Sequence, residues 1–280
     1  MSSQHYSNRI VNIESSGSED SSSGSGESTS GSRGPTYDWV DISVRNFPTI
    51  FRKSDDLDKV IARAPVVRFG LPSDILIAEI CGYTDRVCHG RENAPVDFFY
   101  VYTTLSTNLR VTLPFDDFTM DVLRILNLAP TQLHPNSWAC LQAFRMVCQL
   151  FELAPMAEVF LFYYSTYPVS PVSWVSLVSR PGSVRFATFT TSYKNFKERY
   201  FKIFVEPDGR EYFYTAEGGT RFPFHWMQNP VALNSNFRPA VSVLGKAVMA
   251  IFDQLSHKLP TREIIALYAS SGPWADFISM

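Results

Sequence analysis

The sequence is short of the residues and runs on which many functional classes depend. Only four cysteines and five histidines occur among 280 residues. Met1–Ile10 is polar and has no apolar core of a secretory signal, so we expect an intracellular protein, cytoplasmic or nuclear, with reduced thiols. The strongest apolar runs are too short to cross a bilayer, as in Val159–Tyr164, or contain a charge, as in Val241–Phe252 with Lys246. We therefore expect no transmembrane segment and no membrane partner.

Motifs of catalysis and metal binding are also missing. Cys81 and the Cys88–His89 pair are spaced too widely for a zinc knuckle, and no fourth ligand follows nearby. The sequence has no His-Glu-x-x-His motif, no glycine-rich phosphate loop, no Gly-x-Ser-x-Gly elbow, and no reverse-transcriptase or aspartic-protease signature. Asp116 and Asp117 are adjacent on a predicted helix and point about 100° apart, so they suit a helix N-terminus better than a metal site. These absences predict a non-enzymatic protein without cofactor, metal or small-molecule substrate.

The chain instead has a polar tail followed by a body rich in apolar residues. Half of residues 1–36 are serine or glycine, and the segment has two arginines and four acidic residues. We expect this tail to be disordered because it has almost nothing to bury. It carries the whole formal net charge of −2, so residues 37–280 are neutral and make a poor general polyanion binder. The high apolar content, 45% of all residues, predicts a single globular domain over residues 37–280.

Residues 113–164 predict three helices that form the hub of the fold. Apolar residues recur at helical spacing after Asp116, and the first helix ends at Ala129–Pro130. The second begins after His134, with Asn136 or Ser137 as the expected cap and His134 in a turn or capping role. The third begins near Pro155. The expected buried positions of the first two helices are Phe118, Val122, Ile125, Leu126, Trp138, Leu141, Phe144, Cys148 and Phe151, while Gln142, Arg145 and Gln149 face away.

The rest of the body mixes strands and helices. Three alternating segments and a Pro207–Gly209 turn predict a small antiparallel sheet over residues 174–215, with strands at 174–178, 185–189, 200–205 and 211–215. The C-terminal helices are expected within residues 238–270. Before the hub we expect an extended arm at 37–51, helices at 54–64 and 73–81, and either helix or strand at 98–107, with a linker at 167–171 after it. The fold class is therefore α+β, mainly helical, with a small antiparallel β-sheet and a disordered N-terminal tail.

One family resemblance rests on the hub. The run LPFDDFTMDVLRILNLAPTQLHPNSWACLQAFRMVC, followed by WVSLVSRPG and SYKNFKERYFKI, resembles the plant domain family called "putative gypsy-type transposase". The resemblance covers residues 55–226. It implies a retrotransposon-encoded, gag-like structural protein, and the sequence carries no catalytic motif to match the word transposase. The motif residues that carry it are Leu133, His134, Pro135, Asn136, Trp138, Trp174, Arg180, Pro181 and Gly182.

One basic and aromatic run is a candidate site for single-stranded nucleic acid. Its candidate contacts are Lys194, Lys197, Arg199, Tyr200 and Lys202, with cations to hold phosphates and aromatic rings to stack on bases. The alternative is an amphipathic segment that places its aromatic residues in the core and its lysines in water. The neutral body favours the alternative.

Three functions remain open at this point. The apolar C-terminal helices must pack on the body or on a second copy, so the first hypothesis is a structural domain that self-associates as a homo-oligomer or docks a partner. The second is a nucleic-acid-binding module that uses residues 193–202. The third, an element-encoded nuclease or transposase, rests on the family name alone.

Overall fold

The computed structural model describes residues 37–64, 66, 75–90, 96–169, 174–234, 236 and 238–270. The chain divides into two units, Met1–Gly34 and Pro35–Met280, and every described residue belongs to the second. The expected tail lies outside these residues. Within the described part, no helix is long and apolar enough to span a membrane.

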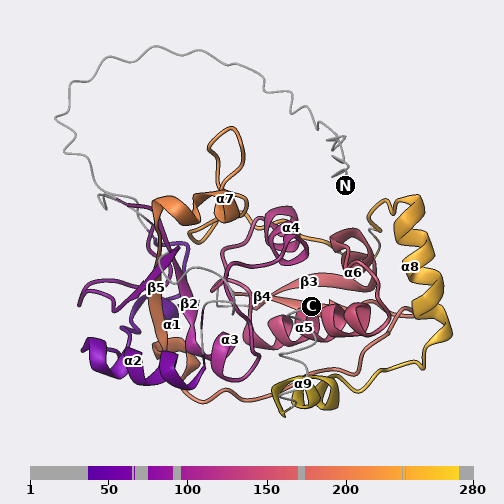
Figure 1. The fold of residues 1–280 in the computed structure, drawn as a ribbon, viewed down its shortest axis with the longest axis horizontal. Coiled ribbons are helices and arrows are strands. Elements are labelled where there is room, and N and C mark those ends of the chain that lie inside the picture. Colours follow the sequence, from indigo (N-terminus) through magenta and orange to yellow (C-terminus); the bar gives the residue numbers. More distant parts are fainter. Residues whose placement is uncertain are drawn as a thin grey trace. The chain divides into compact units, whose positions relative to one another are not determined.

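The three hub helices form as expected (Figure 1). They are α4 (Asp117–Leu126), α5 (Pro135–Leu150) and α6 (Ala157–Tyr163). The Asp116 side chain caps α4 by accepting a hydrogen bond from the Thr119 amide at 2.9 Å. His134 is the cap of α5, because its Nδ1 accepts from the Asn136 amide at 3.2 Å. The prediction that Asn136 or Ser137 caps this helix is wrong, since the proline at the first helical position places the cap at His134.

Aromatic rings join the hub helices to the C-terminal helix α8 (Val243–Gln254). The Phe144 ring of α5 lies 5.4 Å from those of Phe118 and Phe160, and stacks on Phe252 of α8 at 5.1 Å. Such ring pairs add about 0.5–1.5 kcal/mol each beyond their area burial. The core is therefore centred on the middle of α5.

Three side-chain placements expected on the hub are wrong. Ile125 and Phe151 are predicted inside but are 37% and 42% exposed; Ile125 lies in the last turn of α4 and Phe151 is the C-cap of α5. Gln142 was expected to face water but is buried, and its Nε2 donates to the Leu109 carbonyl at 2.8 Å. It lies on the side of α5 that packs on α3 (Thr103–Thr107), so a hydrogen bond to backbone replaces water.

The main sheet has three antiparallel strands in the order β1-β5-β2. They are β1 (Leu76–Glu79), β2 (Phe98–Tyr102) and the central β5 (Tyr200–Val205). A separate antiparallel pair consists of β3 (Tyr164–Val169) and β4 (Trp174–Ser179). Residues 98–107, for which either helix or strand is predicted, form strand β2 and then helix α3. The helix predicted at 73–81 is wrong, since residues 76–79 pair with β5 instead.

Several expectations for the sheet region also fail. Residues 211–215 do not form a hairpin partner, because β1 and β2 already occupy both edges of β5. A 3-10 turn, Pro207–Gly209, leads instead into the short helix α7 (Arg210–Phe213). Residues 185–189 hold one isolated bridge, Phe186 to Leu259, and no strand. Residues 167–169 of the predicted linker belong to β3, and residues 170 and 171 lie outside the described part of the chain. The extended arm predicted at 37–51 contains helix α1 (Ile42–Arg45).

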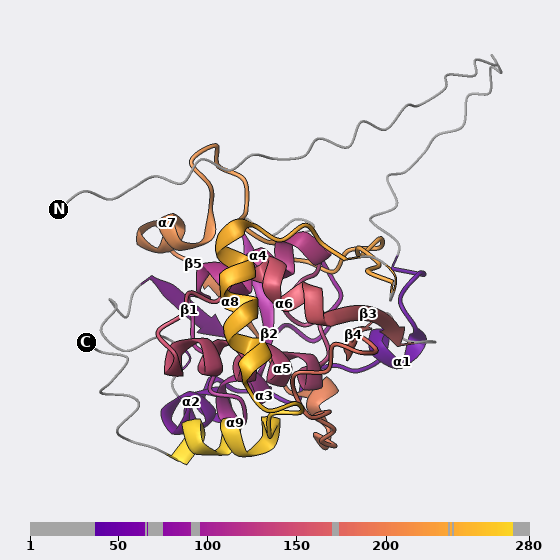
Figure 2. The same ribbon diagram turned by 90° about the vertical axis from the view of Figure 1, so that its right-hand side faces the viewer.

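The remaining helices are close to their predicted positions. Helix α2 covers Ser54–Arg63, and α9 covers Thr261–Ser270. Helix α8 packs against α6 with Val248 and Phe252 buried, and Figure 2 shows it on the near side of the body with α9 below it. Val243 and Leu244, in the first turn of α8, are 86% and 57% exposed.

Candidate functional site

Three residues on which the predicted resemblance rests, Leu133, His134 and Pro135, lie where helix α5 meets strand β4. Residues on both sides of Leu133 hold Val175, which donates to the Gln132 carbonyl and accepts from the His134 amide, both at 2.9 Å. Leu133 itself is buried, and Pro135 opens α5. The motif therefore fixes the start of α5 against β4.

The two motif tryptophans are buried and hydrogen-bonded. Trp138 Nε1 donates to the Pro130 carbonyl at 3.0 Å, and Trp174 Nε1 donates to the Tyr102 hydroxyl at 3.3 Å. Burial raises the pKa of Tyr102, so its hydroxyl remains protonated. Each indole thus satisfies its polar atom inside the core, as buried tryptophans usually do.

Arg180 has an unusual position for a charged side chain, because it is completely buried. Its guanidinium donates to the carbonyls of Asn234 and Leu161. Pro181 and Gly182 follow in a turn that needs a positive φ, +73° at Gly182. Arg180 therefore ties the end of β4 to the loop near residue 234 and to α6.

The basic and aromatic run does not form one continuous surface. Tyr200 is buried and donates to the Phe47 carbonyl at 3.0 Å, so its ring cannot stack on a base. Lys202 forms an ion pair with Asp85 at 2.6 Å. Lys197 lies over the Trp174 ring at 4.7 Å. Only Lys194 and Arg199, among the five predicted contacts, line the same pocket.

That pocket, which we call the cation pocket, brings together three segments that are far apart in the sequence. It encloses about 440 Å³. Its cations are Arg63 at the end of α2, Lys194, and Arg199 just before β5. The described residues that line it are Val60, Arg63, Thr103, Thr104, Thr107, Asn108, Thr191, Ser192, Tyr193, Lys194 and Arg199, and none of these is acidic.

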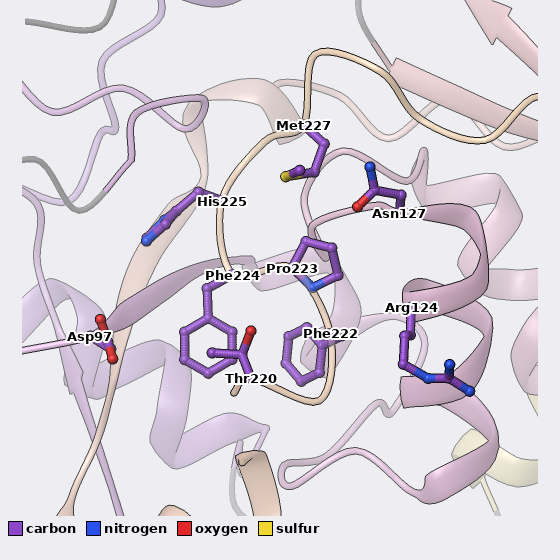
Figure 3. Close-up of a pocket in the computed structure, with 9 residues that line it drawn as sticks. All are labelled: Asp97, Arg124, Asn127, Thr220, Phe222, Pro223, Phe224, His225 and Met227. Carbon is purple, nitrogen blue, oxygen red and sulfur yellow. The ribbon is translucent and has the colours of Figure 1, made fainter. Parts of the chain in front are cut away.

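A second, open cleft of about 510 Å³ is lined by aromatic and polar residues (Figure 3). Asp97 and Arg124 lie on opposite sides of Phe222 and Phe224. Asp97 accepts a hydrogen bond from the Tyr214 hydroxyl at 2.9 Å. The polar groups on the rim therefore already take part in structural contacts.

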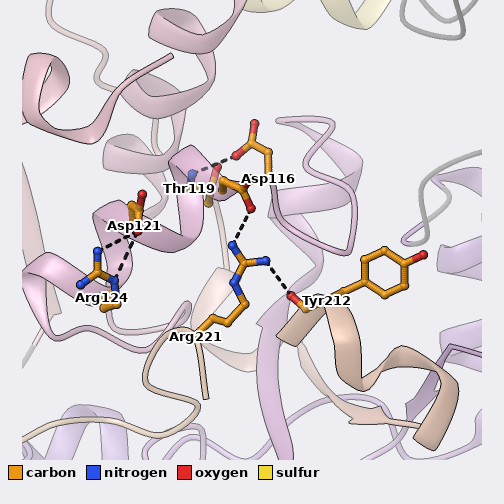
Figure 4. Close-up of polar contacts among 7 residues, drawn as sticks. Asp116, Thr119, Asp121, Arg124, Tyr212 and Arg221 are labelled. Atoms are coloured by element: carbon orange, nitrogen blue, oxygen red, sulfur yellow. Dashed lines mark hydrogen bonds and ion pairs between the residues drawn. The ribbon is translucent and has the colours of Figure 1, made fainter. Parts of the chain in front are cut away.

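Figure 4 shows how the cations beside this cleft are paired. Arg124 binds Asp121 within α4 at 2.9 Å. Arg221 binds Asp117 at 2.5 Å and donates to the Tyr212 carbonyl at 3.4 Å, which links the loop after α7 to the start of α4. These pairs are exposed enough that each contributes at most about 1 kcal/mol. They hold the loop in place rather than aim charge into the cleft.

A third feature is a groove between α5, α8 and α9, which we call the apolar groove. It encloses about 270 Å³, and Gln149 is its one polar lining residue among those described. Leu150 and Leu267 on its rim are 60% and 63% exposed. The other described lining residues are Met146, Val147, Phe151, Leu255, Leu259, Pro260 and Ile264.

The four cysteines are buried free thiols. Burial raises the pKa of Cys81 and Cys148 to about 12, and that of Cys88 and Cys140 to about 11. The thiolate that binds metals and attacks electrophiles is therefore scarce at neutral pH. Among the described residues, no group of three or more His, Cys, Asp or Glu could hold a metal ion.

Sequence reasoning missed Arg63 and the threonines of α3 in the cation pocket, because they are far in the sequence from Lys194 and Arg199. It also missed the groove residues Leu150 and Leu267. The available signal was the apolar content of the C-terminal helices, which predicts that they pack on the body or on a second copy but does not locate the contact.

Comparison with known proteins finds one family match, which includes the hub. No curated protein and no solved structure matches the chain. Two pieces of the predicted resemblance, residues 174–182 and 193–201, lie outside the range that the family model matches. Residues 102–168, from the end of β2 through α3 to α6 and most of β3, match the family described as "putative gypsy type transposon".

Proposed function

We propose that this chain is a transposon-derived, gag-like structural domain that acts by associating with further copies of itself and not by catalysis. The family match supports the transposon origin. The observation that carries the association is the surface of the two C-terminal helices, where the chain leaves apolar side chains in water at two separate places.

The first place is a protruding pair at the start of α8. Val243 and Leu244, which we call the apolar knob, are 86% and 57% exposed and belong to consecutive positions of the first turn. The second place is the apolar groove at the other end of the same helix, where Leu255 lies in the wall. A knob and a groove of the same chemistry on one chain are complementary surfaces for a second copy.

The geometry of α8 prevents the knob from filling the groove of its own chain. Leu244 and Leu255 are separated by eleven helical steps, roughly 16 Å along the axis. A contact between the knob of one copy and the groove of the next is heterologous, because it uses two different patches. Such a contact repeats into rings or open arrays, which suits a protein that builds a particle or lattice.

The experiment is light scattering of the full chain over a wide range of concentrations. We expect a molar mass that rises with concentration, and a monomer at every concentration for the double variant V243D/L244D or for Leu267→Asp. The matched control is Ile42→Asp, which places the same charge on an apolar residue that is 62% exposed on α1. A monomeric wild type, or equal loss of association in the control, contradicts the proposal.

A second candidate function is binding of single-stranded nucleic acid. Lys194 and Arg199, two of the predicted contacts, line one pocket together with a third cation, Arg63. Binding of a single-stranded RNA at low salt, weakened by changes at Arg199 but not at Lys197, is the expected result. Lys197 is the comparison because its ammonium group lies over the rings of Trp174 and Phe47.

A further inference from the structure

We propose that the cation pocket is a binding site for a phosphate group, carried either by free phosphate or by the backbone of a single-stranded nucleic acid. The proposal is independent of the assembly function. It rests on the second candidate function only for the source of the phosphate.

The charge arrangement is the first observation. Arg63, Lys194 and Arg199 reach one pocket from α2, from the loop before the 3-10 turn η1 (Phe196–Glu198), and from the residue before β5. Glu198 is adjacent to Arg199 in sequence, but it is not among the lining residues. Three cations around one hollow repel each other, and an anion in the pocket would offset this repulsion.

The neutral lining residues of the pocket include several that carry hydroxyl groups, which can donate hydrogen bonds to phosphate oxygens. Thr103 and Thr104 are buried at 4% and 5% exposure and still line the pocket. Thr191 Oγ1 is buried and has no hydrogen-bond partner among the described residues. Burial raises the pKa of Tyr193 to about 12, so its hydroxyl keeps a proton to donate.

The walls of the pocket are fixed by the backbone and by the family motif. The Thr103 amide donates to the Arg199 carbonyl at 2.9 Å, which joins the end of β2 to the start of β5. The Thr191 amide donates to Asn136 Oδ1 at 3.1 Å, so the motif asparagine holds the loop that carries Lys194. A pocket with fixed walls loses less entropy when it orders a ligand than a set of surface lysines does.

Arginine gives this pocket a preference for phosphate over a simple halide ion. A guanidinium presents a planar fork of donors that matches two oxygens of a phosphate, and Arg63 and Arg199 provide two such forks. Among the described lining residues Tyr193 alone has an aromatic ring, so recognition is expected through the phosphate and not through the base.

The test uses the full chain and two probes, inorganic phosphate followed by thermal shift, and a fluorescein-labelled single-stranded RNA of mixed sequence followed by anisotropy at low salt. The variants are Arg63→Gln and Arg199→Gln. The matched control is Lys59→Gln, which removes a cation from the same helix α2 but outside the pocket.

We expect each pocket variant to weaken binding roughly tenfold or more, and the control to have no effect. If all three cations contact an RNA backbone, log K falls with log salt with a slope of about −2. Competition of phosphate with RNA identifies the backbone as the source, and phosphate binding without RNA binding identifies free phosphate and ends the second candidate function.

Two outcomes overturn the phosphate site. One is the absence of binding for both probes at low salt. The other is binding that does not depend on the pocket, either because Lys59→Gln weakens it as much as Arg63→Gln does or because neither arginine variant weakens it. In that last case RNA binds elsewhere, so the nucleic-acid function survives while the pocket assignment fails. Molar mass is measured separately and does not depend on either result.

Discussion

Helices α5 and α8 are both rich in apolar residues, but their surroundings differ. Twelve of the sixteen residues of α5 are buried, including the polar Ser137 and Gln142. Only Gly245, Val248 and Phe252 are buried among the twelve residues of α8. The chain covers α5 on nearly every side with its own elements, whereas α8 uses one narrow face for the body and leaves Val243 and Leu244 outside.

The difference shows that the apolar content of a helix does not by itself tell how much of the helix its own chain covers. Gly245 allows α8 to approach α6, since a Cβ there would lie 3.2 Å from Val159 and closer still to two other side chains. This contact fixes one face of the helix only. The opposite face, with Val243 and Leu244, remains exposed, and the proposed association uses this part of the helix.

The largest expected effect is at the centre of α5. Phe144→Ala removes a fully buried ring that contacts Phe118, Phe160 and Phe252, and should lower the free energy of unfolding by about 3–5 kcal/mol. Leu150→Ala on the exposed end of the same helix should change it by at most about 0.5 kcal/mol. Urea denaturation measures both, and similar losses in the two variants would contradict the assignment of the core.

A smaller loss is expected from the polar side of α5. Gln142→Ala leaves the Leu109 carbonyl without its side-chain donor inside the core, which costs about 1–3 kcal/mol. Gln149→Ala on the same helix is the matched control, because Gln149 is only partly buried. Equal stability of the two variants in urea would mean that the Gln142 bond contributes little.

The pH dependence of stability tests the cap of α5. Burial, and then the positive charge of Lys197, lower the pKa of His134 in the folded state. Below the ordinary histidine pKa of about 6.5, the unfolded chain therefore binds more protons at His134 than the folded chain does. The contribution of neutral His134 to stability is complete above that pH and is lost as the pH falls through the pKa of the folded state. Protonation of Nδ1 also removes the acceptor for the Asn136 amide.

His134→Asn isolates that contribution. Asparagine is a good helix cap and does not titrate, so stability near neutral pH should be nearly unchanged while its decline between about pH 7 and 5 becomes shallower. Thermal melts at a series of pH values measure the slope. An identical slope in wild type and variant would remove His134 from the pH response.

The smallest effect on stability is expected at the outer face of α8. Val243 is the first helical residue after the cap Ser242, where an acidic side chain suits the helix dipole. Val243→Asp should therefore change the unfolding free energy by no more than about 0.5 kcal/mol, although it places a charge in the apolar knob. A large destabilisation in urea would show that Val243 packs within its own chain.

The sequence predicts the hub well, because the local signals of α4 to α6 agree with the tertiary structure. The Asp116 cap, the Pro135 start and the helical apolar spacing all act within a few residues. The strands were harder to predict because their pairing is decided at a distance: β1 and β2 reach both edges of β5, so Glu211–Thr215 has no edge left to pair with. The cation pocket depends on the same long-range pairing, which brings Thr103 to Arg199.

The most direct test of association through α8 and α9 is a mixing experiment with two full-length variants, V243D/L244D without the knob and Leu267→Asp with a charged groove rim. Each variant retains one half of a heterologous contact, so the account predicts that each is monomeric alone and that the mixture forms a one-to-one dimer that grows no further in light scattering. A mixture that remains monomeric, while the wild type associates, would contradict the contact between knob and groove.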